Sequence, residues 1–216
     1  MPVNASKLSH MFYGSDDLEY VDLFLDHWPT LYSYGADSAY PKEKATPMHI
    51  VWSQMEKCQE EGLTKSIGVS NYNVQSLCNL LSFCKIKPVV DEVEFHPYLY
   101  QKNLLNFCNK ENIKILSYCP VVKGKAGEKN LNIFEEEIIK NLAKKYGKTE
   151  GQIILNWHMC VGVIPIPGTS NKERFKENLA SCDFKLTNEE IEEICKLNTM
   201  SRICGGTAFG GPDIFA

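Results

Sequence analysis

Three short apolar segments begin at residues 65, 89 and 113, so 24 residues separate each start from the next. This distance accommodates one strand, one turn and one helix. Strands that are joined through helices pair in parallel, because the crossover returns the chain to the same end of the sheet. We therefore expect an α/β fold. The candidate strands are 20–26, 65–70, 89–94, 113–118 and 161–166.

Helix boundaries are marked by capping residues. Thr149 and Thr187 each precede a Gln or Glu by three positions, which is the capping-box pattern at a helix start. Thr46 before Pro47 predicts another N-cap, and Gly62 predicts the end of that helix. Residues 151–171 contain no Asp, Glu, Lys or Arg. Prolines, glycines and polar side chains interrupt this stretch, so we expect a buried helix and strand rather than a membrane span.

Charge and cysteine content exclude several classes of protein. The formal net charge is −4, which argues against a dedicated nucleic-acid binder and against an anionic membrane as the main partner. The nine cysteines form no CxxC pair, so a zinc ribbon or redox dithiol has no support, and we expect no metal site. The first ten residues lack the apolar core of a secretory signal. These features predict free thiols in the cytoplasm.

Repeated strand–helix units are compatible with a doubly wound sheet or a (β/α)8 barrel. No GxGxxG motif follows an early strand, which disfavours a dinucleotide site of the Rossmann type. In a barrel, functional side chains gather where each strand ends and the following loop begins. The polar and aromatic residues at those positions are His27, Trp28, Ser70, Asn71, Glu92, Glu94, His96, Tyr118 and Cys119.

These strand ends resemble the aldo-keto reductases, which are NADP(H)-dependent (β/α)8 TIM barrels. The resemblance implies that the chain contains strands 4–8 of the barrel. The matching segments are VDLFLDHWP (21–29), IGVSNYN (67–73), DEVEFHPYL (91–99), ILSYCPV (115–121) and VIPIPGTSNKERFKEN (163–178).

The resemblance implies a role for each matched residue around substrate and nicotinamide. His27 would hydrogen-bond the substrate carbonyl, and Trp28 would form an aromatic wall of the substrate pocket. Ser70 and Asn71 would bind the nicotinamide carboxamide, while the Tyr118 ring would stack on the nicotinamide. His96 is expected to hold structure instead.

The remaining cofactor contacts are implied farther along the chain. Cys119 stands where the family usually has serine, near the pyrophosphate, and Thr169 lies in the cofactor loop. Arg174 would pair with the 2′-phosphate of NADP(H) through its planar guanidinium. Glu177 and Asn178 would bind the adenine edge.

Two departures bear on the cofactor. The family usually has Asn-Gln where this chain has Asp91-Glu92, and a carboxylate accepts hydrogen bonds but cannot donate them. A negative charge at Glu92 would favour the oxidised, cationic nicotinamide. In addition, Gly168 stands where many members have a lysine, which makes a preference for NADP over NAD less secure.

The largest departure lies before His27. The family's general acid is a tyrosine supported by a lysine and an aspartate, all of which belong upstream of this histidine. Lys7, in Ser-Lys-Leu at the end of a possible third-strand remnant, is a candidate for the lysine. No aspartate and tyrosine with the family's spacing are found. We therefore expect an N-terminally incomplete barrel formed by one domain over 1–216, with a C-terminal tail at 199–216.

Three interpretations remain open. The chain represents an NADPH-dependent reductase of aldehydes and ketones that is weakly active or inactive alone, a non-catalytic nucleotide-binding or regulatory protein, or a gene-model fragment. A small carbonyl compound is the expected substrate class. Open strand edges would favour oligomerisation.

Overall fold

The computed structural model describes residues 19–29, 46–126 and 129–204. Lys7 and the part of the predicted C-terminal tail after residue 204 lie outside these residues. The chain divides into two compact units, the first comprising Met1–Glu92 with Asn109–Ile113, and the second Val93–Cys108 with Lys114–Ala216. The single domain expected over 1–216 stays a prediction.

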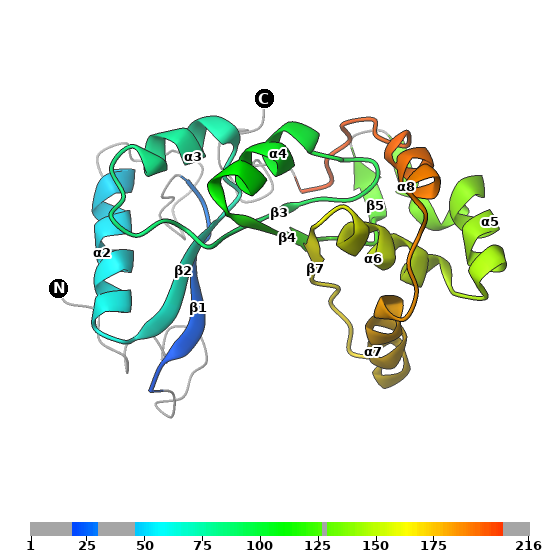
Figure 1. The fold of residues 1–216 in the computed structure, drawn as a ribbon, viewed down its shortest axis with the longest axis horizontal. Helices are drawn as coiled ribbons and strands as arrows, with labels where there is room; N and C mark the ends of the chain where they lie inside the picture. Colours follow the sequence, from blue (N-terminus) through cyan, green and yellow to red (C-terminus); the bar gives the residue numbers. More distant parts are fainter. Residues whose placement is uncertain (1–18, 30–45, 127–128, 205–216) are drawn as a thin grey trace. The chain divides into compact units, whose positions relative to one another are not determined.

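Unit 1 is a parallel α/β assembly. Its strands are β1 (Val21–Asp26), β2 (Thr64–Ser70) and the first part of β3 (Val90–Glu94), and β2 pairs in parallel with both of the others. Helix α2 (Met48–Glu60) connects β1 to β2 and packs on β2, and α3 (Val74–Leu81) connects β2 to β3 (Figure 1). The parallel α/β class expected from the 24-residue spacing is therefore confirmed.

The register of these strands brings their carboxyl ends to one edge. Asp26 lies opposite Val69, which in turn lies opposite Asp91, and the next residue of β2, Ser70, lies opposite Glu92. Residues that follow directly after the strands therefore emerge at the same edge of the unit 1 sheet.

Gly68 is required for the close approach of these strands. A Cβ atom at this position would lie 2.6 Å from Cγ2 of Val90, 2.7 Å from Cδ2 of Leu25 and 2.9 Å from the Val90 carbonyl oxygen. Because two of these contacts come from opposite neighbours in the sheet, a larger side chain would force the strands apart.

Helix α2 is fixed by polar contacts as well as by burial. Trp52 is buried and donates its indole N–H to the Ile86 carbonyl at 3.0 Å. The predicted N-cap at Thr46 is wrong: the helix begins at Met48, and Pro47 occupies the N-cap position without a side-chain hydrogen bond. Proline has no side-chain acceptor, but its fixed φ suits a helix entry. Gly62 follows the helix with φ +75°, as predicted for a residue that ends it.

Unit 2 also contains a parallel strand pair. Strand β4 (Lys114–Tyr118) pairs with β7 (Ile164–Pro165), which is shorter than the predicted strand over 161–166. The difference arises because Val161 caps the preceding helix and Gly162 turns the chain with φ +85°.

The helices that lie wholly in this unit are α5 (Glu137–Tyr146), α6 (Glu150–Cys160), α7 (Lys172–Leu179) and α8 (Asn188–Cys195). Helix α4 (Lys102–Glu111) begins in unit 2 and ends in unit 1.

Both capping boxes are present. The Thr149 side chain accepts from the backbone of Gln152 at the start of α6, and Thr187 accepts from the backbone of Glu190 at the start of α8. The uncharged stretch forms most of α6, whose residues from Gln152 to His158 are all buried as expected. The expectation of a buried strand is wrong, because Ile164 in β7 is 48% exposed. In the described ranges, no helix is long and apolar enough to cross a membrane.

One part of unit 2 is absent from the sequence prediction. Strands β5 (Lys123–Ala126) and β6 (Lys129–Asn132) form an antiparallel hairpin, followed by the short 3₁₀ helix η2 (Ile133–Glu135). A second 3₁₀ helix, η3 (Ala180–Cys182), follows α7. The hairpin was missed because its sequence is rich in lysine, glycine and asparagine, which have low strand propensity.

Candidate functional site

His27 and Trp28 follow β1 at the carboxyl edge of unit 1. Their ring centroids lie 5.8 Å apart with the planes tilted by 31°. His27 is exposed and Trp28 is partly exposed, so both rings are accessible at the strand end. An imidazole and an indole side by side can supply one polar contact and one apolar wall to a small ligand.

Ser70 and Asn71 tie the neighbouring strand ends together. The Ser70 hydroxyl donates to the Glu92 carbonyl at 2.7 Å, and the Asn71 backbone N–H donates to the same oxygen at 2.9 Å. The Asn71 side-chain amide donates to the His27 carbonyl at 2.9 Å and to the Ser70 hydroxyl at 3.1 Å. Asn71 has φ +63°, a conformation that asparagine tolerates better than most residues. These two buried side chains therefore hold His27 and Glu92 in place.

Glu92 presents a half-buried carboxyl group at this edge. Burial raises the pKa of Glu92, while the nearby His27 acts in the opposite direction. The preceding Asp91 is fully buried, and burial raises its pKa well above the ordinary value. Its Oδ1 atom accepts only a long hydrogen bond of 3.4 Å from the Tyr72 backbone, and its Oδ2 atom has no partner in the described part of the chain.

The structure also reveals a tyrosine–aspartate pair that sequence reasoning missed. The Tyr72 hydroxyl donates to Oδ2 of Asp26 at 2.7 Å, and the tyrosine is buried. Burial is the main reason that the pKa of Tyr72 is raised, and the Asp26 charge adds to it. A phenol whose pKa is raised further from neutrality is a poorer proton donor, so this pair is structural. The two residues lie 46 positions apart, and no local spacing signals their contact.

Tyr118 and Cys119 end β4 in unit 2. The preceding Ser117 is buried and donates to the Phe95 carbonyl at 2.6 Å, which fixes this end of the strand. Tyr118 is half-buried, and burial raises its pKa. Cys119 has φ +50° and an exposed side chain. The turn after the strand therefore presents one aromatic ring and one thiol.

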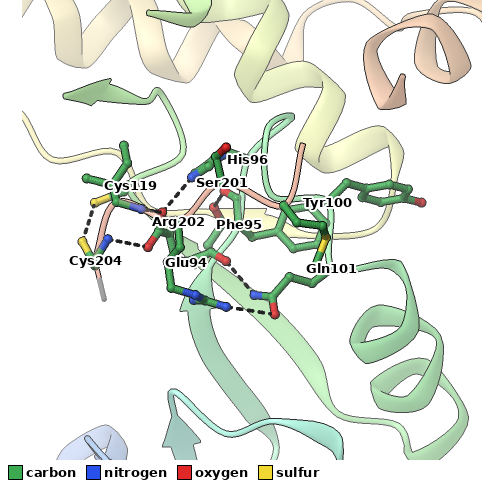
Figure 2. A network of polar contacts seen from close by, with 12 residues as sticks. Glu94, Phe95, His96, Tyr100, Gln101, Cys119, Ser201, Arg202 and Cys204 are labelled. Atoms are coloured by element: carbon green, nitrogen blue, oxygen red, sulfur yellow. Dashed lines mark hydrogen bonds and ion pairs between the residues drawn. The ribbon is translucent and has the colours of Figure 1, made fainter. Parts of the chain in front are cut away.

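Glu94 organises the polar network beside this turn (Figure 2). Its two carboxylate oxygens accept from the backbone N–H of Ile203 at 2.6 Å and of Cys204 at 2.7 Å, and Oε1 also contacts Nε2 of His96 at 2.8 Å. Although burial opposes it, the combined effect of these donors lowers the pKa of Glu94. Glu94 thus holds residues 203–204 against the end of β3 as an ionised group.

Helix α7 carries the three residues expected at the adenosine end. Arg174, Glu177 and Asn178 are three and four positions apart, so they share one face of the helix. Arg174 is exposed, whereas one carboxylate oxygen of Glu177 accepts from the Thr149 hydroxyl at 2.5 Å. Asn171 caps the helix by accepting from the backbone of Glu173 and Arg174. The Thr169 hydroxyl accepts from the Asn171 backbone at 3.1 Å and so shapes the loop before α7.

The sequence-predicted residues that the structure describes are divided between the two units, and hydrogen bonds join those of unit 1 at one sheet edge. Within the ranges 19–29, 46–126 and 129–204, no cluster of three or more His, Cys, Asp or Glu side chains could hold a metal ion. Lys7 lies outside the described residues. The unit 1 group is His27, Trp28, Ser70, Asn71 and Glu92, and the unit 2 group is Tyr118, Cys119, Thr169, Arg174, Glu177 and Asn178.

Comparison with known proteins identifies the family. The Aldo/keto reductase family model matches residues 16–199, which is most of the chain. The chain therefore belongs to the aldo/keto reductase family, whose (β/α)8 barrel accounts for the parallel strands and intervening helices.

Individual relatives agree with this assignment. Aldose reductase B of Dictyostelium discoideum is 39% identical over 198 residues, covering 87% of this chain and 62% of that protein. Aldose reductase C of the same organism is 39% identical, covering 91% of this chain and 63% of that protein. A solved Bombyx mori aldo-keto reductase in complex with NADP superimposes with a TM-score of 0.82 at 30% identity, covering 95% and 66% of the two chains. The chain thus spans about three-fifths of the length of the curated relatives.

Proposed function

We propose that this chain binds NADP(H) and contributes to the reduction of small aldehydes or ketones. The observation that carries the proposal is the edge formed by His27, Ser70, Asn71 and Glu92, where interstrand hydrogen bonds hold polar groups at adjoining strand ends. Two solved relatives support the cofactor, since one is in complex with NADP and another with NADPH.

In unit 1, we assign substrate and nicotinamide contacts. His27 would donate to a carbonyl oxygen, and the Trp28 ring would exclude water from one side of the substrate. Bound NADPH would supply the hydride. Ser70, Asn71 and Glu92 would face the carboxamide, although their hydrogen bonds within the chain give the first two a positioning role as well.

In unit 2, the donor set fits an anionic dinucleotide. Tyr118 offers a half-buried ring for stacking, and the Cys119 turn would lie by the pyrophosphate. The exposed guanidinium of Arg174 suits a phosphate because it presents paired N–H donors in one plane. Thr169 would support the cofactor loop, and Glu177 and Asn178 would contact the adenine.

Cofactor titrations test this proposal. NADPH and NADH are added separately to the full chain while quenching of protein fluorescence is followed. We expect tighter binding of NADPH, and Arg174→Ala should weaken NADPH binding roughly tenfold with little effect on NADH, because only NADPH has the 2′-phosphate.

The matched control is Lys176→Ala. Lys176 is exposed on the same helix and pairs with Glu173 at 3.1 Å, so its removal changes the charge of α7 equally without touching the proposed site. Failure of the wild-type chain to bind NADPH, or equal losses in the two variants, contradicts the assignment.

We further propose that these 216 residues, assayed by themselves, turn over slowly. No tyrosine and aspartate with the family's spacing occur in the sequence, and Tyr72 has a raised pKa that makes it an unsuitable substitute. Loss of a general acid typically lowers the rate ~10²–10⁴-fold. Nucleotide binding with negligible turnover would also characterise a regulatory protein, which is the second candidate function.

Turnover is measured from the loss of NADPH absorbance with a simple aldehyde. Tyr72→Phe should leave any residual rate unchanged, because the Tyr72 hydroxyl serves Asp26 rather than the substrate. Rapid reduction by the wild-type chain contradicts the slow-turnover proposal, and its loss in Tyr72→Phe would make Tyr72 the proton donor.

A further inference from the structure

Two free cysteines from distant parts of unit 2 lie in contact. The sulfur atoms of Cys119 and Cys204 are 3.8 Å apart, although 85 residues separate them in the sequence (Figure 2). All nine cysteines lie within the described residues, and none forms a disulfide. Cys119 is exposed and Cys204 is half-buried, so a small oxidant can reach this pair.

Both thiols are held in position by the backbone around them. Glu94 accepts from the Cys204 backbone N–H at 2.7 Å. Earlier in the same segment, the backbone N–H groups of Thr199 and Ser201 donate to the Tyr98 carbonyl at 3.2 and 3.1 Å. Cys119 follows a strand whose Ser117 is fixed to Phe95. The contact therefore joins two segments that are anchored independently.

We propose that Cys119 and Cys204 are a redox site, and that a hydroperoxide converts them reversibly into a disulfide that fastens segment 199–204 to the end of β4. The sulfurs need to approach from 3.8 Å to a bonding distance of about 2 Å. Part of this approach would come from rotation of the two side chains, because the thiols are already in contact.

The reaction balances with one peroxide. With hydrogen peroxide as the oxidant, the Cys119 thiolate attacks one peroxide oxygen, so that an S–O bond forms, the O–O bond breaks, and the leaving hydroxide takes a proton to become water. The Cys204 sulfur then attacks the resulting sulfenic acid, forming the S–S bond and releasing a second water. Two thiols are oxidised, one peroxide is reduced, and a dithiol reductant reverses the change.

The electrostatics of the pair favour Cys119 as the attacking thiol. The hydrogen bond between the two thiols lowers the pKa of Cys119 and raises the pKa of Cys204. The more exposed sulfur is therefore also the one more readily ionised, which is the pattern of a reactive cysteine.

The disulfide has a consequence for the cofactor that rests on the proposed function. Cys119 directly follows Tyr118, and the charges of Arg202 and Glu94 already act on the Tyr118 hydroxyl. Fixing segment 199–204 beside this ring should slow exchange of a nucleotide stacked on it. We expect NADPH dissociation to slow roughly fivefold or more after oxidation.

Peptide mapping of the full chain tests the cross-link. The protein is treated with a small excess of hydrogen peroxide, its remaining thiols are alkylated, and the digest is analysed by mass spectrometry. We expect a peptide joining Cys119 to Cys204, a loss of about 2 Da from the protein before alkylation, and recovery of both thiols with dithiothreitol. Cys119→Ser and Cys204→Ser should each abolish the joined peptide, whereas Cys78→Ser, at an exposed thiol on α3, should retain it.

Formation of the disulfide and its effect on NADPH release can be contradicted by separate results. Recovery of Cys119 only as sulfinic or sulfonic acid, or joined to other cysteines, overturns the redox site whether or not NADPH binds. Stopped-flow measurement of NADPH release from reduced and oxidised protein tests the consequence, and equal rates overturn the regulatory step. Absence of NADPH binding by the reduced chain would refute the proposed function while leaving the disulfide intact.

Discussion

Asp91 and Glu94 lie three residues apart on β3 and are both buried, yet their environments shift the pKa of the two carboxyl groups in opposite directions. Glu94, in unit 2, accepts from two backbone N–H groups and contacts His96, and these partners lower its pKa. Asp91, in unit 1, has one long hydrogen bond, and burial raises its pKa well above the ordinary value. Burial alone therefore does not decide whether a carboxyl group is ionised; the number and quality of its donors do.

This difference in pKa gives the two buried carboxyl groups different structural roles. An ionised Glu94 attracts the backbone of residues 203 and 204 and anchors a segment that has little regular structure. Asp91 attracts no such segment and behaves as a neutral side chain over a wider pH range. Substitutions that remove the charge should accordingly be costly at Glu94 and harmless or favourable at Asp91.

The largest effect is expected from Glu94→Gln. The amide keeps one acceptor but points an N–H₂ group toward a backbone donor, so at least one of the Ile203 and Cys204 N–H groups loses its partner. We expect a loss of about 3 kcal/mol in the free energy of unfolding at neutral pH, measured by urea denaturation. Faster amide hydrogen exchange at Ile203 and Cys204 would locate the effect.

The pH dependence gives a second readout for Glu94. Because its folded pKa lies below the ordinary value of 4.5, its stabilising contribution is present above pH 4.5 and disappears as the pH falls through the folded pKa. The difference between wild type and Glu94→Gln should therefore shrink in acid. Glu135→Gln, at an exposed residue, is the control. If both variants unfold at the same urea concentration, Glu94 is not the anchor.

A smaller effect of opposite sign is expected from Asp91→Asn. The folded pKa of Asp91 is raised, so its favourable contribution is complete below its ordinary value of 3.8 and is lost as the pH rises through the folded pKa. Asparagine cannot ionise, so the variant should be more stable than wild type at alkaline pH, by about 1 kcal/mol, and similar to it near pH 4.

Urea denaturation at pH 4 and pH 9 tests this difference. Asp22→Asn provides the control, since Asp22 is exposed and pairs with Lys65 at the surface. A variant that is equally destabilised at both pH values would mean that Asp91 makes a contact as a carboxylate, and would remove the contrast with Glu94.

The regular part of this fold was predictable from the sequence because it depends on local signals. The 24-residue spacing indicated parallel strand–helix units, and Thr149 and Thr187 marked helix starts through contacts only three residues away. Strand β7 was overestimated because an apolar run does not reveal where the preceding helix stops. The β5–β6 hairpin was missed because its residues have little preference for strands.

The positions of the candidate site residues followed from the strand ends, but their partners did not. The sequence predicts Ser70 and Asn71 as cofactor contacts, and the structure shows that both tie strand ends together. Tyr72 with Asp26 and Cys119 with Cys204 are separated by 46 and 85 residues. Contacts of this kind depend on how strands and segments meet in space, for which a single sequence carries no periodic signal.

The smallest expected effect concerns Glu92. Its environment is intermediate between those of Asp91 and Glu94, because it is half-buried and His27 opposes the rise in pKa that burial causes. Its backbone carbonyl, not its side chain, accepts from Ser70 and Asn71, so Glu92→Gln leaves those bonds intact. Removing a negative charge beside a cationic nicotinamide should lower the affinity for NADP⁺ relative to NADPH about fivefold at pH 8. Fluorescence titration with each cofactor gives this ratio.

The pH dependence distinguishes an effect of the Glu92 charge from an effect of its hydrogen-bond geometry. A raised pKa means that Glu92 becomes protonated, and able to donate like glutamine, as the pH falls toward its folded pKa. The affinity ratios of wild type and Glu92→Gln, compared at pH 8 and at acid pH, should therefore converge at the lower pH, while Glu61→Gln, at an exposed residue of the same unit, should follow wild type throughout. A ratio that differs equally at both pH values would assign the effect to hydrogen-bond geometry, and equal ratios at pH 8 would show that the Glu92 charge does not act on the nicotinamide.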